Sequence, residues 1–323
     1  MYDIVTIGDA LKDTFIKPHN VDTFKNVRNG TEICFSHGAK ISVDEAHYDI
    51  GGSACNVAVG MSRLGFKSAI IGAIGGDQTG QEIIDRLNQE NVDVKYLKRI
   101  QKNQSNFSII IVHGGQRTVL VYRALKDYSE IKIPKTISTK WLYLGPVATS
   151  FSPNYKDIIR LASEKNINIA VNPGSRQIEE GRRELVKLLY VTKILFLNKE
   201  EAEELTKLGG FPSIKELLKR LKSIGPEIVI ITDGPKGACL YNGENYYKIS
   251  AYKTESIDPT GAGDAFSSGF LTSYINSGDI EMSLKYGIMN SSEVITSYGA
   301  QNKLADAAKI GKIITMSPDV YKE

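Results

Sequence analysis

Residues 258–266 read DPTGAGDAF, and a long stretch with helical spacing begins inside this run, at Ala262. Gly261, Ala262 and Gly263 carry almost no side chain, so the backbone can approach a ligand closely here. The first N–H groups of a helix have no partner within it, and the helix dipole adds about half a positive charge at that end. The run therefore predicts a cradle for an anion such as a phosphate.

Asp264 falls in the first turn of this predicted helix. Its carboxylate could interact favourably with the helix dipole, an effect worth about 0.3–1 kcal/mol. It could instead accept a proton from a hydroxyl held beside the phosphate. The local sequence leaves both interpretations open, so the rest of the chain has to decide between them.

Short apolar runs elsewhere in the chain predict a parallel sheet. They are rich in β-branched and aromatic residues, as buried strands are, and they occupy residues 4–7, 69–71, 141–144, 167–171, 194–197 and 228–231. Stretches with helical spacing lie between them, at residues 80–90, 155–165, 200–208 and 213–223. This alternation predicts an α/β fold with a doubly wound, mostly parallel sheet and helices on both faces. The final third turns helical, at residues 262–276 and 281–297.

Two segments, at about residues 14–49 and 99–127, interrupt the alternation. The second contains two β-branched runs around Gly114 and Gly115, a pattern typical of an antiparallel hairpin. We expect residues 1–323 to form one domain in which these insertions build a small β-sheet. Such a sheet is well placed to be a lid over a site, and its apolar face could also join two copies into a homodimer.

Composition excludes several classes of protein. The 40 Lys and Arg residues against 37 Asp and Glu give a net charge of +3, which does not favour nucleic acid or a membrane surface as a partner. No apolar run approaches the roughly 20 residues that span a bilayer. Three widely separated cysteines and an N-terminus without signal-peptide features point to the cytoplasm. We find no spacing typical of a Cys/His metal site, a P-loop or a catalytic triad.

Two further glycine-rich runs accompany the first. Residues 51–58 read GGSACNVA, and residues 72–80 read GAIGGDQTG. Together with residues 258–264, in this order, they resemble the PfkB family of ribokinase-like carbohydrate and nucleoside kinases over nearly the whole chain. The resemblance implies a ribokinase-like fold and ATP-dependent transfer of the γ-phosphoryl group to a hydroxyl of a small sugar. It also implies that Asp264 is the catalytic base and that Gly261, Ala262 and Gly263 form the anion hole.

Asn198 follows a predicted strand, and Glu201 stands three residues later. The spacing alone is that of a helix N-cap with a capping-box glutamate. An amide and a carboxylate on one face of a first turn also suit Mg²⁺ that is held largely through water. The resemblance implies this second role, because the family has an Asn-x-x-Glu magnesium motif at this position. It also suggests a monovalent cation such as K⁺ near Asp258.

Residues 232–237 read TDGPKG and follow another predicted strand. By themselves they predict a turn. In the family the matching turn lies along the phosphates of the nucleotide, and a looser motif near residues 298–300 flanks the adenine. The resemblance therefore implies these ATP contacts: Asn198, Thr232, Gly234, Lys236, Gly237 and Asn290.

Residues 8–13 read GDALKD and follow the first predicted strand. Polar residues at strand ends face the ligand crevice in α/β sheets, although an aspartate such as Asp9 also favours an ordinary turn. The resemblance makes Asp13 a ligand of the acceptor hydroxyls. Our candidate acceptor-binding residues are Asp9, Asp13, Gly51, Gly52, Asn56 and Arg123. Ser53 stands where ribokinases usually have lysine, and residues 144–147 lack their strand-end glutamate, which makes ribose a less suitable acceptor.

Other functions remain open beside a sugar kinase. A nucleoside kinase could place a purine over Tyr122 or Phe107. A kinase of an acidic sugar such as 2-keto-3-deoxygluconate could pair its substrate with Arg123, although this arginine could also be a solvated charge at a strand edge. A non-catalytic binding protein would need neither Asp264 nor the pair of Asn198 and Glu201, and their presence therefore favours an enzyme.

Overall fold

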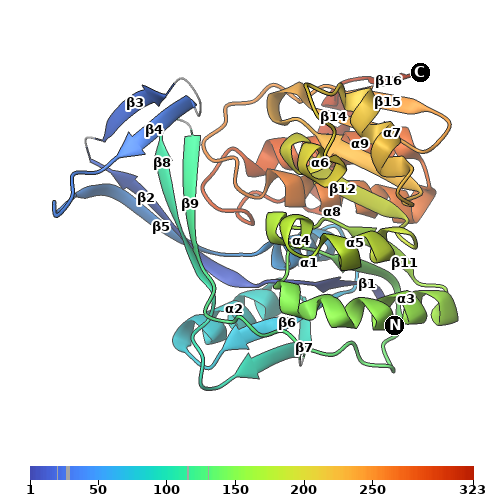
Figure 1. Cartoon of the computed structure of the whole chain (residues 1–323), viewed down its shortest axis with the longest axis horizontal. Helices are drawn as coiled ribbons and strands as arrows, with labels where there is room; N and C mark the ends of the chain where they lie inside the picture. Colours follow the sequence, from blue (N-terminus) through green and yellow to red (C-terminus); the bar gives the residue numbers. More distant parts are fainter. Residues whose placement is uncertain (20, 27–29, 115, 130) are drawn as a thin grey trace.

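The computed structural model describes the whole chain except residues 20, 27–29, 115 and 130. A ten-stranded sheet forms its centre (Figure 1). In spatial order the strands are β16 (Val320–Lys322), β15 (Tyr246–Ile249), β14 (Ala238–Tyr241), β13 (Ile228–Thr232), β12 (Ile194–Asn198), β11 (Asn168–Val171), β10 (Thr139–Leu144), β1 (Tyr2–Ile7), β6 (Ser68–Gly75) and β7 (Asp93–Ile100). All neighbours from β13 to β7 are parallel, whereas β14, β15 and β16 pair antiparallel.

Helices cover both faces of this sheet. One face packs against α3 (Tyr155–Lys165), α4 (Ser175–Glu179), α5 (Arg182–Leu189), α6 (Lys199–Thr206) and α7 (Ile214–Lys222). The other face packs against α1 (Ser53–Arg63), α2 (Gln78–Gln89), α8 (Ala262–Ser277), α9 (Ile280–Val294) and α10 (Ala307–Ile313). Central strands are therefore buried on both sides, and every residue of β6 is buried. The predicted doubly wound α/β fold is confirmed.

The sequence pattern missed β7 and the antiparallel strands β14 to β16. These strands lie toward the two edges of the sheet. β7 is interrupted by charged residues, and β14 and β15 are only four residues long and alternate between buried and less buried positions. A search for continuous apolar runs does not find such strands.

A smaller sheet stands to one side of the core, and we call it the small sheet (Figure 1). Its strand order is β5 (Val43–Gly51), β2 (Leu11–Pro18), β8 (Phe107–His113) and β9 (Gln116–Tyr122). β3 (Asp22–Asn26) and β4 (Gly30–Cys34) pair in a separate two-stranded antiparallel sheet. A smaller sheet beside the main one was expected. Its bounds differ from the predicted segments, because β2 begins at Leu11 and residues 99 and 100 belong to β7. Residues 20, 27–29 and 115 of those segments lie outside the described residues.

The two faces of the small sheet have different surroundings. Side chains alternate along a strand, and Asp13 and Phe15 of β2 therefore point to one face. Phe15 is buried against Tyr298, which follows α9 in the core, with ring centroids 6.1 Å apart. We call this side the inner face, since it looks toward the core. The opposite side, with Tyr48 and Leu120, is the outer face.

Candidate functional site

Asp264 lies half-buried in the first turn of α8 and accepts hydrogen bonds on both carboxylate oxygens. Ser53 Oγ donates to Oδ1 over 2.5 Å, and Asn56 Nδ2 donates to Oδ2 over 2.8 Å. Both donors belong to the start of α1, so that the glycine-pair motif and the 258–264 motif meet here across 211 residues of sequence. Burial raises the pKa of the Asp264 carboxyl, while the two hydrogen bonds and the charge of Arg117 oppose that rise. A carboxyl placed in this way can accept a proton from a neighbouring hydroxyl.

The start of α8 is open, as an anion cradle requires. Gly261 has φ of +79°, and a Cβ at this position would lie 2.4 Å from the Cβ of Ala300, so the position requires glycine. A Cβ added to Gly263 would meet no described atom within 4 Å. Within the part of the chain that the structure describes, no side chain caps the N-terminus of α8. The Ala262 N–H donates to the Pro259 carbonyl over 3.3 Å, and the next residue, Gly263, borders the cavity beside the helix.

A cavity of about 420 Å³ lies beside this helix start. Its walls are the turn after β13, the loop of residues 251–256, the start of α8 and the last turns of α9. The predicted residues that line it are Thr232, Gly234, Gly237, Ala262 and Gly263. A smaller cavity next to it is also bordered by Thr232 and Gly263, and it extends to Asn198 and Glu201. The structure therefore brings the 232–237 turn, the 261–264 run and the Asn198–Glu201 pair to one place.

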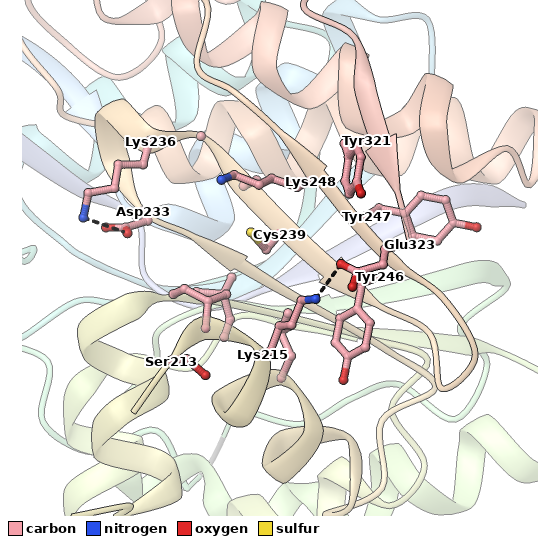
Figure 2. A pocket seen from close by; sticks show the side chains of 15 residues that line it. Ser213, Lys215, Asp233, Lys236, Cys239, Tyr246, Tyr247, Lys248, Tyr321 and Glu323 are labelled. Carbon is pink, nitrogen blue, oxygen red and sulfur yellow. Dashed lines mark hydrogen bonds and ion pairs between the residues drawn. The ribbon is translucent and has the colours of Figure 1, made fainter. Parts of the chain in front are cut away.

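Lys236 departs from the expectation that it lies with the other residues of its turn. It is exposed, and its Nζ pairs with Asp233 Oδ2 over 3.2 Å. Figure 2 shows both side chains at a different cavity of about 440 Å³, which lies between the start of α7 and strands β14 to β16. Because Lys236 does not line the cavity beside α8, we do not assign it a role there.

Asn290 also lies away from the cavity, in the core. Its Nδ2 donates to the Ala265 carbonyl over 2.8 Å and to Ser268 Oγ over 3.2 Å, and its Oδ1 accepts from the Ala305 N–H over 2.9 Å. These contacts join α9 to α8 and to the loop that follows α9. The next residues, Ser291 and Ser292, line the cavity instead.

Asn198 and Glu201 form the capping box that their spacing predicts. Asn198 Oδ1 accepts from the Glu201 N–H over 2.8 Å, and Glu201 Oε2 accepts from the Asn198 N–H over 3.0 Å. Burial and the nearby charges of Asp264, Glu200 and Glu204 together raise the pKa of Glu201 to about 7, although the hydrogen bond from the Asn198 N–H opposes the rise. The capping interaction therefore leaves an excess of negative charge at this point, which a cation would relieve.

Asp13 lies on the inner face of the small sheet and is buried. Ser108 Oγ donates a hydrogen bond to Asp13 Oδ1, and Asp49 stands opposite Asp13 on β5. Burial, with the charges of Asp49 and Asp258, raises the pKa of Asp13 to about 6, while Ser108 and the charge of Arg117 oppose the rise. Burial likewise raises the pKa of Asp49. The predicted acceptor residue thus belongs to an acidic pair.

The glycine pair gives these carboxyl groups room. A Cβ at Gly51 would lie 2.0 Å from Asp13 Oδ2. Gly52 has φ of +96°, and a Cβ there would lie 2.3 Å from the Asp9 carbonyl oxygen. Only glycine fits this approach of the start of α1 to the loop after β1.

Asp9 and Arg123 are partners in the structure. Arg123 Nε lies 3.7 Å from Asp9 Oδ2, and Asp9 is buried. Burial raises the pKa of Asp9, while Tyr128 and Arg123 lower it. The charge of Arg123 is therefore already balanced by the carboxylate of Asp9. This ion pair was not expected, because the sequence suggested either a contact with a sugar acid or a solvated charge.

Phe107 and Tyr122 form a tilted ring pair with centroids 5.0 Å apart. Phe107 stands opposite Lys12 and next to Ser108, so strand alternation puts the ring pair on the outer face. Asp13 and Ser108 are on the inner face. The two rings therefore cannot lie over a purine that is bound beside Asp13.

Asp258 ties two loops together. Its Oδ1 accepts from the N–H and the hydroxyl of Thr260, over 3.0 and 2.6 Å, and its Oδ2 accepts from the Gly299 N–H over 3.1 Å. Within the described ranges, no three His, Cys, Asp or Glu side chains are grouped so that they could hold a metal ion.

The sequence pattern missed three residues of this site. Ser53 was read only as a departure from the lysine of ribokinases, yet it donates to Asp264. Asp49 could have been recognised from its position shortly before the glycine pair. Gln301, whose Nε2 donates to Asn56 Oδ1 over 3.0 Å, had no recognisable signal because its partner lies 245 residues away.

Comparisons with known proteins find relatives that are named as kinases. A nucleoside kinase of Methanocaldococcus jannaschii is 28% identical over 273 residues, which cover 84% of this chain and 87% of that protein. A 5-dehydro-2-deoxygluconokinase of Clostridium botulinum is 25% identical over 293 residues, which cover 85% of this chain and 86% of that protein.

Solved structures of ribokinase-like proteins share the fold. Arabidopsis thaliana ribokinase in complex with ribose and ATP superposes with a TM-score of 0.80 at 18% identity, covering 98% of this chain and 99% of that one. A candidate ribokinase II of E. coli in complex with ATP and Mg²⁺ gives a TM-score of 0.77 at 18% identity, covering 98% and 100%. The fold is therefore that of the ribokinase-like kinases.

The pattern that defines the pfkB family of carbohydrate kinases matches residues 24–307. The chain belongs to this family and is a sugar or nucleoside kinase. ATP binding is typical of the family. Among the described residues, no helix is both long and apolar enough to cross a membrane.

Proposed function

We propose that the protein transfers the γ-phosphoryl group of ATP to a hydroxyl of an uncharged sugar or nucleoside, with Asp264 as the general base. One observation carries this proposal. Asp264 stands at the open start of α8, next to the cavity beside that helix, and Ser53 and Asn56 hold its carboxylate. The base, an anion cradle and a space for a nucleotide thus lie together.

The cavity beside α8 would take the nucleotide. Phe266, Ile288 and Ile295 supply apolar walls for a base, and Gly263 and Thr232 border the passage toward Glu201. The phosphates would then point to the start of α8, where N–H groups and the helix dipole stabilise negative charge. Gly261, Ala262 and Gly263 act in this arrangement as the anion hole.

Bound Mg²⁺ would neutralise the phosphates, which is the chemistry that this ion supplies in phosphoryl transfer. Glu201 and Asn198 fit that role, because burial and nearby carboxylates raise the pKa of Glu201 to about 7, and a cation would offset that unfavourable charge. Both side chains also form the capping box, so they would hold the ion largely through water. K⁺ beside Asp258 stays a prediction, since both oxygens of that carboxylate already accept hydrogen bonds.

In the reaction, the acceptor oxygen forms a bond to the γ-phosphorus while the bond from that phosphorus to the bridging oxygen of ADP breaks. The proton of the acceptor hydroxyl passes to the Asp264 carboxylate. Burial favours the protonated form of this carboxyl after the transfer, and the hydrogen bonds from Ser53 and Asn56 keep it aligned before the transfer. Most of the rate enhancement would come from positioning and electrostatics.

The acceptor site favours an uncharged ligand with neighbouring hydroxyl groups. Asp13 and Asp49 can only accept hydrogen bonds when ionised, and they stand side by side on the inner face. The small sheet would act as a lid that excludes water from this site. An anionic acceptor would have to approach these carboxylates, whereas the cation of Arg123 is paired with Asp9.

An ADP-release assay with a panel of neutral sugars, nucleosides and sugar acids tests the proposal. We expect turnover with a neutral acceptor, and a loss of roughly 10²- to 10⁴-fold in the Asp264→Asn variant without loss of nucleotide binding. A thermal-stability control shows that the variant is folded. Turnover within threefold of the parent protein would leave Asp264 only the role of a helix-capping charge.

A sugar acid is the second candidate, because relatives are named 5-dehydro-2-deoxygluconokinase. Titrating the acceptor against Asp13→Ala and Arg123→Ala separates the two. A neutral acceptor should lose about 1–3 kcal/mol of binding in Asp13→Ala, because its hydroxyls lose their partner. A large loss confined to Arg123→Ala would favour the sugar acid.

A further inference from the structure

We propose that Arg86 and Gln301 are positioning residues that fix the direction in which the Asn56 amide bonds to Asp264. This inference rests on the proposed role of Asp264 as the base. Neither residue lines the cavities described above, and both act through Asn56.

The contacts form a continuous chain from the surface to the carboxylate. Arg86 Nε on α2 donates to Gln301 Oε1 over 3.2 Å. Gln301 Nε2, in the loop after α9, donates to Asn56 Oδ1 over 3.0 Å. Asn56 Nδ2 on α1 then donates to Asp264 Oδ2 over 2.8 Å. Elements from four parts of the sequence thus meet in one line of hydrogen bonds.

The chain can run in only one direction. A guanidinium group donates hydrogen bonds and cannot accept them, so the atom of Gln301 that faces Arg86 must be its oxygen. The amide nitrogen of Gln301 then faces Asn56 and donates to the amide oxygen of that residue. The NH₂ group of Asn56 is left pointing at Asp264. An ionised Asp264 only accepts hydrogen bonds and therefore also favours the amide nitrogen of Asn56. A protonated Asp264 could donate to an amide oxygen instead, and the chain from Arg86 opposes that reversal. The chain therefore favours the ionised form of Asp264.

Burial makes this direction hard to change. Gln301 is 0% exposed and Asn56 is 3% exposed, so water does not readily replace a lost partner. If the Asn56 amide reversed, its oxygen would face the oxygen of Asp264, and this half-buried carboxylate would lose a hydrogen bond that stabilises its charge. Fewer molecules would then hold an ionised base near neutral pH.

A second arginine separates positioning from ordinary anchoring. Arg63 Nη1 donates to the Gln301 and Leu304 carbonyls over 2.6 and 3.1 Å, which fixes the backbone of the same loop. Arg63 and Arg86 also share Glu90 as a partner. Arg63 therefore holds the backbone of the loop in place, whereas Arg86 bonds the side-chain amide of Gln301.

The test compares Arg86→Met, Arg86→Lys and Arg63→Met with the parent protein, using the pH profile of kcat and the KM for ATP. We expect Arg86→Met to move the acidic limb of the profile upward by about one pH unit, with the KM for ATP unchanged. Lysine, like arginine, donates hydrogen bonds and cannot accept them. In Arg86→Lys the acidic limb of the pH profile should therefore return toward its position in the parent protein. Arg63→Met should lower stability without moving the limb, because it leaves the amide direction intact.

Gln301→Glu gives a second route to the same conclusion, since a carboxylate cannot donate to Asn56. We expect the same upward movement in this variant. Should it fail to fold, Arg86→Met still decides, because the Arg86 side chain is partly exposed and Glu90 keeps Arg63 as its partner. The other titratable groups that face Asp264, unchanged in every variant, are Glu201, Tyr143 and Arg117.

Carbon-13 NMR titration of the Asp264 carboxyl in each variant gives a measurement that does not need turnover. If the parent protein phosphorylates no acceptor but Arg86→Met raises the carboxyl pKa, the proposed function fails and the positioning role stands. Equal pKa values in the parent protein, Arg86→Met and Gln301→Glu would overturn the positioning role, whatever the activity. Equal shifts of the Asp264 pKa in Arg86→Met and Arg63→Met would also overturn the positioning role.

Discussion

At the scale of single residues, the site places several carboxyl groups close together, at a cost in electrostatic energy. Burial and mutual repulsion raise the pKa of Asp13 to about 6 and of Glu201 to about 7. Groups with perturbed pKa values gather where binding or proton transfer takes place. The charge of Arg117 lowers the pKa of Asp13 but does not cancel the rise, and a ligand or cation could relieve what remains at both carboxyl groups.

The two glycines at the start of α8 allow a matched test of the anion cradle. Gly261→Ala should destabilise the fold, because the position has φ of +79° and the new Cβ would lie 2.4 Å from the Cβ of Ala300. In Gly263→Ala the added methyl would meet no described atom within 4 Å. It would enter only the space of the ligand.

We therefore expect Gly263→Ala to keep the thermal stability of the parent protein and to lose at least tenfold in kcat/KM for ATP, which corresponds to about 1.4 kcal/mol. Thermal melts and steady-state kinetics on both variants check this. A Gly263→Ala variant with full activity would show that the phosphates do not approach this backbone.

Glu201→Gln tests the magnesium assignment. A glutamine at this position can still accept a hydrogen bond from the Asn198 N–H, so that the capping box survives, but the negative charge is lost. We expect a severalfold increase in the Mg²⁺ concentration that gives half-maximal rate, with little change in the melting temperature. An identical magnesium titration in the parent protein and the variant would leave Glu201 only its role in the helix cap.

At the scale of elements, the two faces of the small sheet present different kinds of side chain. The inner face presents Asp13 and Ser108 and packs Phe15 on Tyr298, whereas the outer face exposes Tyr48, Phe107, Leu120 and Tyr122. Exposed apolar side chains that adjoin one another on a sheet favour association. We expect the outer face to join two copies of the chain.

Leu120 and Val119 provide neighbouring positions on opposite faces. They are 53% and 44% exposed. We expect Leu120→Lys to convert a dimer into a monomer in size-exclusion chromatography with light scattering, because a buried lysine would lose its hydration. Val119→Lys should keep the dimer and weaken acceptor binding, since Val119 lies on the inner face, as Asp13 does. A parent protein that is already monomeric at tens of micromolar would refute the dimer.

At the scale of the whole molecule, the site should reduce the stability of the unliganded protein as pH rises. The pKa of Asp13 lies near 6 in the folded protein against 3.8 for an ordinary aspartate. Between these values the folded protein binds more protons than the unfolded chain, and the free energy of unfolding therefore falls as pH rises. Above pH 6 this penalty is complete, at about 3 kcal/mol. Burial shifts Asp9, Asp49 and Asp264 in the same direction.

Asp13→Asn should consequently stabilise the unliganded protein at pH 8 by up to about 3 kcal/mol, and this advantage should vanish toward pH 4. Urea unfolding of the parent protein and the variant at both pH values measures the difference. A difference that does not depend on pH would mean that the folded Asp13 carboxyl has its ordinary pKa.

The amino-acid sequence determined the features that depend on local pattern. Parallel strands such as β6 are buried on both faces and read as apolar runs, so the doubly wound fold could be predicted from periodicity alone. The helix start at Gly261 and the capping box of Asn198 and Glu201 depend on neighbouring residues, and their spacing predicted them.

Only the tertiary structure decided which of these motifs meet and which way their side chains point. Ser53 reaches Asp264 across 211 residues, and Gln301 reaches Asn56 across 245, contacts that no local pattern records. Lys236 belongs to the right turn but points to another cavity, and Asn290, one residue from the cavity wall, lies in the core. Periodicity predicts which elements form, whereas the orientation of each polar side chain depends on the partners that folding brings to it.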